Sequence, residues 1–179
     1  MPAKAGTDEE ERARGQASEK LELRRVDDQL GVYAIAPIDA GERLIALARV
    51  FVDRADRFTI QIDELLHQAG TFEMDDYLNH SCHPNCFLDF EQLAFVALRP
   101  IAVGEQLSFN YLSSEWSMAT PFRCWCDATG AERVHCVHEI RGFKFLRRDQ
   151  QIRLRPLLSP FLRRKLHELL AGDPPEEAG

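Results

Sequence analysis

From Leu21 onwards the sequence divides into short runs of residues that favour β-strands. Such runs stand at 58–62, 87–90, 93–97 and 107–109. The run at 58–62 alternates apolar and polar residues, which is typical of a short strand, and the Glu91-Gln92 pair between two of the other runs predicts a hairpin. The sequence therefore predicts a mainly β (α+β) chain of short, mostly antiparallel sheets.

One stretch of sequence occurs twice in related form. Residues 34–44 align with residues 97–107 at Ala, Pro, Ile, Gly, Glu and Leu. Each copy indicates a strand, a bend that begins at proline, a glycine with positive φ (Gly41 and Gly104) and a second strand. Two copies are too few for a repeat protein, so we expect one corner used twice within a single domain of the 179-residue chain.

A helix is predicted at the C-terminal end. Ser159 is placed to cap it, Pro160 suits its first position, and Gly172 suits its end. Leucines at 162, 166, 169 and 170 form one apolar stripe. We expect a helical extension over 147–172, a flexible tail over 173–179 and a disordered leader over 1–20.

Neither a secretory signal nor a membrane span is expected. The first 20 residues lack an apolar core, and the longest nearly apolar run, Leu44–Val52, is too short to cross a bilayer and contains Arg49. We therefore expect an intracellular protein, in the cytoplasm or the nucleus, without membrane binding.

Charge is distributed unevenly along the chain, whose net charge is −7. Residues 21–140 carry 9 Lys and Arg against 19 Asp and Glu, whereas residues 141–165 carry 9 against 1. An acidic main domain suits a cationic partner better than a phosphate backbone, so no direct nucleic-acid binding is expected. The basic stretch is interpreted as an amphipathic segment that lies on the acidic body, with nucleic-acid contact as the alternative.

Two groups of residues carry the chemistry. Residues 79–86, Asn-His-Ser-Cys-His-Pro-Asn-Cys, place metal ligands and amides in one loop, and Cys124, Cys126 and Cys136 form a second group. Three close thiols in a chain without a disulfide framework are one ligand short of tetrahedral zinc, and Cys82 or a nearby histidine would supply the fourth. Inert or redox-active thiols are the other interpretation.

These residues resemble those of a known family. Residues 79–85 are similar to the NHSCxPN motif of the SET-domain protein-lysine N-methyltransferases, and residues 104–111, Gly-Glu-Gln-Leu-Ser-Phe-Asn-Tyr, resemble the GEELTFDY motif that follows it. The three later cysteines look like the family's post-SET cluster, and residues 31–34 resemble its N-terminal corner. The resemblance implies a SET domain over 21–118 with a threaded C-terminal segment, and a post-SET-like cysteine segment over 119–146.

The resemblance also implies roles for individual residues. The methyl donor would be S-adenosylmethionine, and the catalytic residue beside the transfer channel would be Tyr111. Phe109, in the same channel, would leave room for di- or trimethylation. The residues implied to bind the donor are Leu30, Gly31, Val32, Tyr33, Tyr77, Asn79, His80 and Trp125.

A structural zinc ion is implied by the same resemblance. Its ligands would be Cys82, Cys124, Cys126 and Cys136, and it would hold the C-terminal segment over the active site. Cys86 is left over and is expected in the core. The expected partner is a protein or peptide such as a histone, with a lysine in a basic context, and the expected oligomeric state is a monomer.

Two other functions remain open. Gln29 stands where the family's corner has glycine, Asp76 where a basic residue is common, and the gap before Cys136 is long. These departures favour a SET-like peptide-binding module that has lost turnover. A thiol-redox or metal-handling protein that uses Cys124 and Cys126 is the alternative from a different class, and it predicts no affinity for the methyl donor.

Overall fold

The computed structural model describes residues 17–26, 28–124 and 136–172. Its strands are β1 (Leu21–Val26), β2 (Gln29–Ala34), β3 (Arg43–Ala46), β4 (Phe51–Val52), β5 (Ile60–Asp63), β6 (Leu66–Gln68), β7 (Asn79–His80), β8 (Cys86–Asp89), β9 (Ala94–Ala97), β10 (Ser108–Phe109), β11 (Phe122–Arg123) and β12 (Glu139–Ile140). Its helices are α2 (Arg148–Arg153) and α3 (Pro160–Gly172), with 3-10 turns η1 (Met74–Tyr77), η2 (Tyr111–Ser113), η4 (Phe143–Phe145) and η5 (Arg155–Leu157). No helix of the described part combines the length and apolar character needed to cross a membrane.

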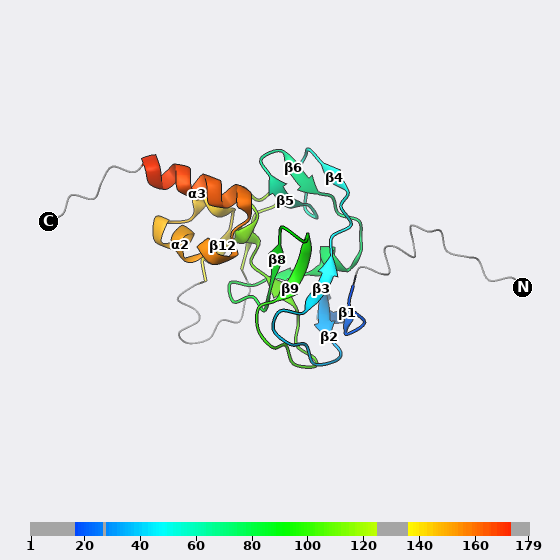
Figure 1. Ribbon diagram of the computed structural model, residues 1–179. Coiled ribbons are helices and arrows are strands. Elements are labelled where there is room, and N and C mark those ends of the chain that lie inside the picture. Colours follow the sequence, from blue (N-terminus) through cyan, green and yellow to red (C-terminus); the bar gives the residue numbers. More distant parts are fainter. Residues whose placement is uncertain (1–16, 27, 125–135, 173–179) are drawn as a thin grey trace, which may run out of the picture.

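The strands form several small sheets, and the two α-helices gather on one side of them (Figure 1). The three-stranded sheets have the orders β3-β9-β8 and β4-β6-β5, and the pairs are β1-β2, β11-β12 and β7-β10. All of these pairings are antiparallel except that of β7 with β10. The prediction of a mainly β chain of short, mostly antiparallel strands is confirmed.

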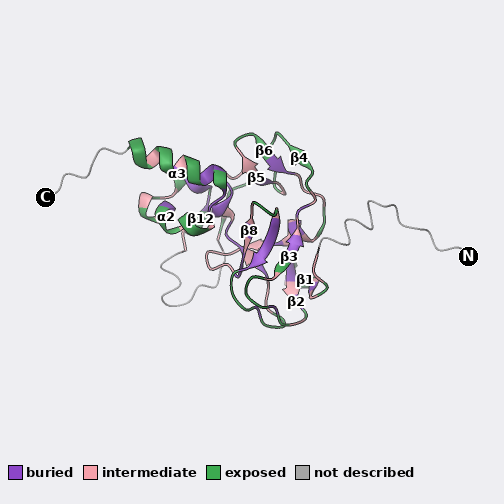
Figure 2. Cartoon of the chain, viewed as in Figure 1, coloured by how far each residue is buried: buried purple, intermediate pink, exposed green. Residues whose placement is uncertain are grey.

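The sheet β3-β9-β8 forms the centre of the main core. Every residue of β9 is buried (Figure 2). The side chain of Phe95 in this strand has no exposed surface. The predicted hairpin is present, with Cys86 opposite Ala97 and Asp89 opposite Ala94. The turn takes in one more residue at each end than expected, Phe90 and Leu93, and Leu93 adopts a positive φ of 51°.

The two related corners pack against each other. Ile38 and Ile101 exchange backbone hydrogen bonds of 3.1 and 3.0 Å, and both side chains are buried. Gly41 and Gly104 have φ values of 85° and 84°, as the sequence predicts, and this region of φ disfavours residues with a Cβ. The repeated stretch thus forms two equivalent corners within one core.

The folded part begins earlier than the sequence predicts. Ala17 forms a β-bridge with Ile45, and the Ser18 amide donates to the Leu44 carbonyl at 2.7 Å. Lys20 pairs with Glu42, also at 2.7 Å. Residues 17–20 therefore belong to the domain and not to the leader, because their backbone groups pair with the start of β3.

The parallel pair β7-β10 brings together two distant parts of the chain. Asn79 lies opposite Ser108, and His80 lies opposite Phe109. The amides of Ser81 and Asn85 extend the pairing by donating to the carbonyls of Phe109 and Ser108. The two motifs that the sequence analysis singled out are therefore neighbours in space.

The helices enclose a second, smaller core. Its buried members are Phe143, Leu158, Phe161, Leu162 and Leu166. The predicted leucine stripe is only half right, because Leu169 is half-buried and Leu170 is exposed where α3 extends beyond the body. The basic segment does lie on acidic residues, since Arg164 pairs with Asp63 at 2.6 Å and Lys165 with Glu64 at 3.4 Å.

Ser159 caps α3 as predicted. Its hydroxyl accepts a hydrogen bond from the Leu162 amide at 3.1 Å, and the residue is fully buried. We expect Ser159→Ala to lower the free energy of unfolding by about 1 kcal/mol, because that amide loses its acceptor. A melting temperature lowered by about 2–4 °C would follow for a chain of this size.

The matched control is Ser117→Ala. The hydroxyl of Ser117 makes no hydrogen bond within the described ranges, so this variant should melt with the wild type. Equal melting temperatures for the two variants would show that the cap contributes nothing.

Candidate active site

A cavity of about 800 Å³ lies between β2, the segment before β5, η1 and the β7-β10 pair. It is lined by Arg25, Asp28, Gln29, Leu30, Asp56, Arg57, Phe58, Thr59, Ile60, Asp75, Asp76, Tyr77, Leu78, Asn79, His80, Ser81, Gln106, Ser108, Phe109, Tyr111, Glu115, Met118, Ala119, Thr120 and Phe122. Amide side chains, charged side chains and several aromatic rings all line this cavity. A cavity with this mixture is the usual form of a small-molecule site.

Asn79 is fixed against the N-terminal hairpin. Its Nδ2 donates to the Leu30 carbonyl at 2.9 Å, and its Oδ1 accepts from Nε2 of Gln29 at 3.1 Å. Gly31 permits this approach, because a Cβ there would lie 2.2 Å from Nε2 of Gln106 and 3.2 Å from Nδ2 of Asn79. The corner and the Asn-His pair, about fifty residues apart in sequence, form one end of the cavity.

Not all of the residues expected at that end reach the cavity. Leu30, Tyr77, Asn79 and His80 line it, whereas Gly31, Val32 and Tyr33 do not. Val32 is fully buried in the core, and the Tyr33 ring packs under the Arg24 guanidinium at 4.9 Å. The cavity is lined only by the first two residues of β2, Gln29 and Leu30, and the strand then continues away from it into the core. Trp125 lies outside the described residues.

His80 is held as a neutral imidazole. Its Nδ1 accepts a hydrogen bond from the Tyr111 amide at 3.2 Å, so the ring proton is on Nε2, which lies 3.4 Å from the Cys82 sulfur. Burial lowers the pKa of His80 to about 4. Its ring contacts those of Tyr111 and Phe122 edge-on.

Tyr111 lies at the aromatic end of the cavity. Its hydroxyl donates to the Leu78 carbonyl at 2.8 Å, and its ring centroid lies 4.7 Å from that of Phe109. Burial, followed by the negative charge of Glu115, raises the pKa of Tyr111. The phenol is therefore neutral at physiological pH, and its oxygen keeps lone pairs for a further donor. Phe109, which lines the cavity beside it, offers no hydroxyl.

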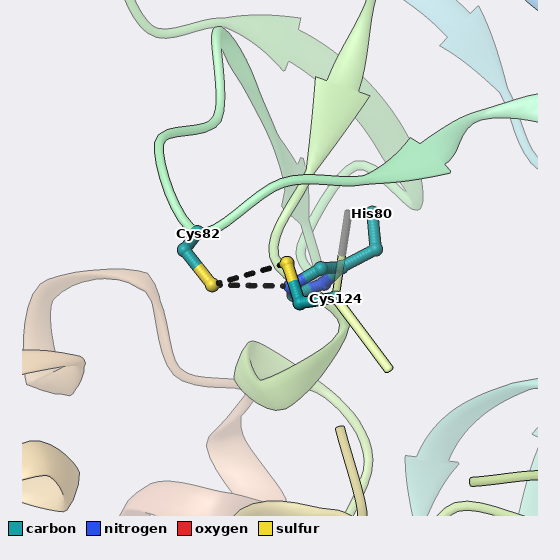
Figure 3. Close-up of side chains that lie close together, drawn as sticks. All are labelled: His80, Cys82 and Cys124. Carbon is teal, nitrogen blue, oxygen red and sulfur yellow. Dashed lines mark hydrogen bonds between the residues drawn. The ribbon is translucent and has the colours of Figure 1, made fainter. Parts of the chain in front are cut away.

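Three possible metal ligands come together beside this end. The Cys82 sulfur lies 3.8 Å from that of Cys124 and near Nε2 of His80 (Figure 3). Because Nε2 carries the ring proton while Nδ1 accepts from Tyr111, His80 is a poor zinc ligand, and the two thiols are the better ones. Cys136 lies near His138, whose carbonyl accepts from the Cys124 amide at 2.7 Å. Cys126 lies outside the described residues.

Cys86 is separate from this group. It is fully buried, and its thiol donates to the Ser108 carbonyl at 3.2 Å. Burial raises the pKa of the thiol to about 12, which makes it unreactive. The expectation that Cys86 is a core residue is confirmed.

Comparison with known proteins agrees with this arrangement. Residues 29–112 match the family model described as the SET domain. The chain contains a SET domain. The fold expected from the two motifs is thereby confirmed, and the motifs lie inside or beside the cavity of this domain.

Several curated proteins resemble this SET-domain chain. Methyltransferase flvH of Aspergillus flavus is 34% identical over 100 residues, which are 54% of this chain and 49% of that protein. Histone-lysine N-methyltransferase Su(var)3-9 of Drosophila pseudoobscura is 29% identical over 105 residues, 48% and 17% of the two chains. Histone-lysine N-methyltransferase 2B of Homo sapiens is 27% identical over 128 residues, 58% and 5%. The chain thus spans about half the length of the first relative and much less of the other two.

Two buried carboxyl groups of the SET-domain cavity were not anticipated as site residues. Asp75, on η1, is 3% exposed, and both of its carboxyl oxygens lack a hydrogen-bonding partner. Glu115, just after η2, is 7% exposed. Burial raises the pKa of each to about 7, and the charge of Asp76 adds to the effect at Asp75. Asp75 adjoins Asp76, the family departure noted above, but nothing in the local sequence marks Glu115.

The raised pKa of Asp75 predicts a stability that depends on pH. In the unfolded chain the carboxyl titrates near 4, so its ionisation penalises the folded state increasingly from about pH 4 to 7 and fully above pH 7. We compare the free energy of unfolding of Asp75→Asn with that of the wild type at each pH. The difference in favour of the variant should be larger at pH 8 than at pH 4, by about 1–3 kcal/mol. Denaturant unfolding of both proteins across this range measures the difference.

Asp53→Asn is the matched control, because Asp53 is an exposed carboxylate. Its unfolding should follow the wild type at every pH. A gain for Asp75→Asn that is the same at pH 4 and pH 8 would contradict the assigned ionisation.

Proposed function

We propose that this SET domain transfers methyl groups from S-adenosylmethionine to the side-chain nitrogen of a lysine in a protein. The observation that carries the proposal is the single cavity in which Asn79 and His80 at one end meet Tyr111 and Phe109 at the other. Methyl transfer to an amine needs both reactants held in line and shielded from water. A cavity shared by the two motif regions supports that requirement.

The residues present fit the methyl donor. The cavity volume lies in the range of ordinary cofactor sites, and Gln29, Asn79 and Gln106 supply amide groups at its polar end. Acidic residues outnumber the arginines along its wall, which favours a ligand of positive charge. When bound, the donor supplies a methyl group on a positively charged sulfur.

Tyr111 and Phe109 would act on the amine. Because the Tyr111 hydroxyl donates to the Leu78 carbonyl, its free lone pairs are available to accept an N–H of the amine and orient the nitrogen. Phe109 would leave the space beside the nitrogen without a bound water, so a nitrogen that already carries methyl groups would fit. We therefore propose di- or trimethylation as the accessible products.

The cysteines would hold a structural zinc ion. Cys82 and Cys124 lie 3.8 Å apart, which is close to the separation of two thiolates on one tetrahedral zinc. Cys126 and Cys136 are the proposed remaining ligands. Such an ion would tie the β11-β12 hairpin to the loop after β7 and so keep Phe122 against His80 and Tyr111.

The proposed substrate is a lysine in a basic context. The net negative charge of residues 21–140 favours a cationic peptide, and two of the relatives are named histone-lysine N-methyltransferases. Core histones are therefore the first proteins to test.

The first test is calorimetric binding of S-adenosylmethionine to the zinc-loaded protein. We expect micromolar binding that is lost in Asn79→Ala, because the amide that joins β2 to β7 is removed. Transfer of a labelled methyl group to core histones and to a lysine peptide array follows. A wild-type protein that binds no methyl donor would exclude the proposed reaction.

The hydrogen bond between Gln29 and Asn79 favours one alternative. The Gln29 side chain lines the polar end of the cavity, where the family's corner has glycine and leaves that space open. A peptide-binding module without turnover would have no need of this space. Such a module would bind basic peptides and transfer no methyl group. A thiol-redox protein would neither bind basic peptides nor transfer a methyl group, so calorimetric binding of a basic peptide, together with the methyl-transfer assay, separates all three functions.

A further inference from the structure

Glu115 lines the cavity with one oxygen engaged and the other unengaged. Its Oε1 accepts hydrogen bonds from the Gln61 amide at 2.8 Å and from the Ser114 hydroxyl at 3.1 Å. Its Oε2 has no hydrogen-bonding partner in the described part of the chain. Oε2 is not among the fully buried polar atoms without a partner, so it keeps some contact with the open cavity that Glu115 lines.

The surrounding structure fixes this side chain firmly. The Trp116 amide donates to Oε1 of Gln61 at 2.9 Å, while the Gln61 amide donates to Glu115. The segment of Glu115 and that of Gln61 therefore hold each other in place, although the two residues are 54 positions apart in sequence. The Phe143 amide donates to the Glu115 carbonyl at 2.8 Å. Glu115 is thus oriented from β5 and from η4, and its position needs no ligand.

Glu115 acts electrically on Tyr111. Its negative charge is the second cause, after burial, of the raised pKa of the phenol. Both side chains line the same cavity. Glu115 therefore lies within electrostatic reach of the place where the amine would be methylated.

The proposed reaction, on which this inference rests, requires a proton to leave. A lysine side chain in water titrates near pH 10.4, so it arrives as an ammonium without a lone pair. We propose that Glu115 receives this proton on Oε2 and thereby frees the nitrogen to attack the methyl group. The carboxylate becomes a carboxylic acid, the N–C bond forms as the S–C bond breaks, and the sulfur keeps the electron pair of the broken bond. The acid then returns its proton to solvent.

Burial makes the group suitable for this role. It raises the pKa of Glu115 to about 7, against which the hydrogen bonds from Gln61 and Ser114 act. A base that titrates near the working pH combines availability with driving force. A purely structural role would be met by glutamine, whose Oε1 accepts the same two hydrogen bonds without the cost of a buried charge.

The test is the variant Glu115→Gln in the zinc-loaded protein. We expect kcat to fall about 100-fold or more while S-adenosylmethionine binding is unchanged. In the wild type kcat should decline as the pH falls through about 7, because Glu115 becomes protonated. We call this decline the acid limb of the pH profile. In Glu115→Gln the acid limb should lie more than about one pH unit higher. The other charged or titratable groups along the cavity are Arg25, Asp28, Asp56, Arg57, Asp75, Asp76, Tyr77, His80 and Tyr111.

Two controls identify the group that titrates. Asp53→Asn removes an exposed carboxylate that does not line the cavity and should leave both kcat and the profile as in the wild type. Asp75→Asn removes the other carboxyl group with a pKa near 7 and should keep the acid limb in place. An acid limb that disappears with Asp75 and persists in Glu115→Gln would overturn the proposal.

A second measurement does not depend on turnover. n-Butylammonium is the end of a lysine side chain, and n-butanol is its uncharged counterpart. With S-adenosylhomocysteine present at pH 8, we expect the wild type to prefer the ammonium by about tenfold and Glu115→Gln to show no preference. NMR of the wild-type Glu115 carboxyl carbon should show a lower pKa when the ammonium is bound, so the test holds even if the variant fails to fold.

The outcomes separate this inference from the proposed function. A wild type that transfers methyl groups, together with a Glu115→Gln variant of equal kcat and equal acid limb, refutes the role of Glu115 alone. An unaltered preference for n-butylammonium in the variant does the same. A wild type that binds no methyl donor refutes the proposed function itself.

Discussion

Tyr111→Phe should reduce kcat for methyl transfer by about 100-fold or more and leave the affinity for S-adenosylmethionine within a factor of about two. The variant loses the hydroxyl that donates to the Leu78 carbonyl and keeps the ring that packs on Phe109 and His80. The amine then loses the acceptor that orients it, whereas the polar end of the cavity is untouched. Single-turnover methyl transfer and calorimetry measure the two effects separately.

Tyr33→Phe is the matched control. It removes a phenolic hydroxyl from a side chain that packs on Arg24 outside the cavity. Its kcat should equal that of the wild type. If Tyr111→Phe retained full kcat, the phenol would be a packing residue, and the chemical centre would have to be sought elsewhere along the cavity.

Cys82→Ser should abolish stoichiometric zinc binding and lower the melting temperature by roughly 10 °C, because a structural zinc site of cysteine thiolates contributes several kcal/mol. Binding of S-adenosylmethionine should weaken as well, since Phe122 would no longer be held against His80. Metal analysis of the purified protein, thermal unfolding and calorimetry give the three readouts. Removal of zinc from the wild type with a strong chelator should reproduce all three changes.

Cys86→Ser tests whether the effect belongs to the site. It makes the same chemical change four residues away, at a buried thiol that donates to the Ser108 carbonyl, a bond that a serine hydroxyl can replace. This variant should retain one zinc ion per chain. Retention of zinc by Cys82→Ser would instead remove Cys82 from the ligand set.

Local sequence was sufficient for the features that depend on neighbouring residues. The hairpin between β8 and β9, the positive φ of Gly41 and Gly104, and the capping of α3 by Ser159 all follow from backbone preferences within a few positions. The motif resemblance added the family, because the Asn79-His80 pair and the segment before Tyr111 are recognisable as sequences.

Features that depend on distant partners could not be read in the same way. Glu115 is an ordinary polar residue in sequence, and only its contact with Gln61 on β5 reveals that it is buried beside Tyr111. The cavity reaches Leu30 at the start of β2 but not Val32 two residues later, and this depends on how far along the strand the rest of the domain covers it. The leucines at the end of α3 fit a helix pattern, yet the body ends before it can cover Leu170.

Strand β5 connects the C-terminal helix α3 with the wall of the cavity. On one side its Asp63 pairs with Arg164 of α3, and on the other its Gln61 holds Glu115 at the cavity wall. The C-terminal helix therefore acts as a brace for that wall through contacts that salt can weaken. Changes in α3 far from the cavity would be transmitted along a strand of four residues to the carboxyl group of Glu115 at the cavity wall.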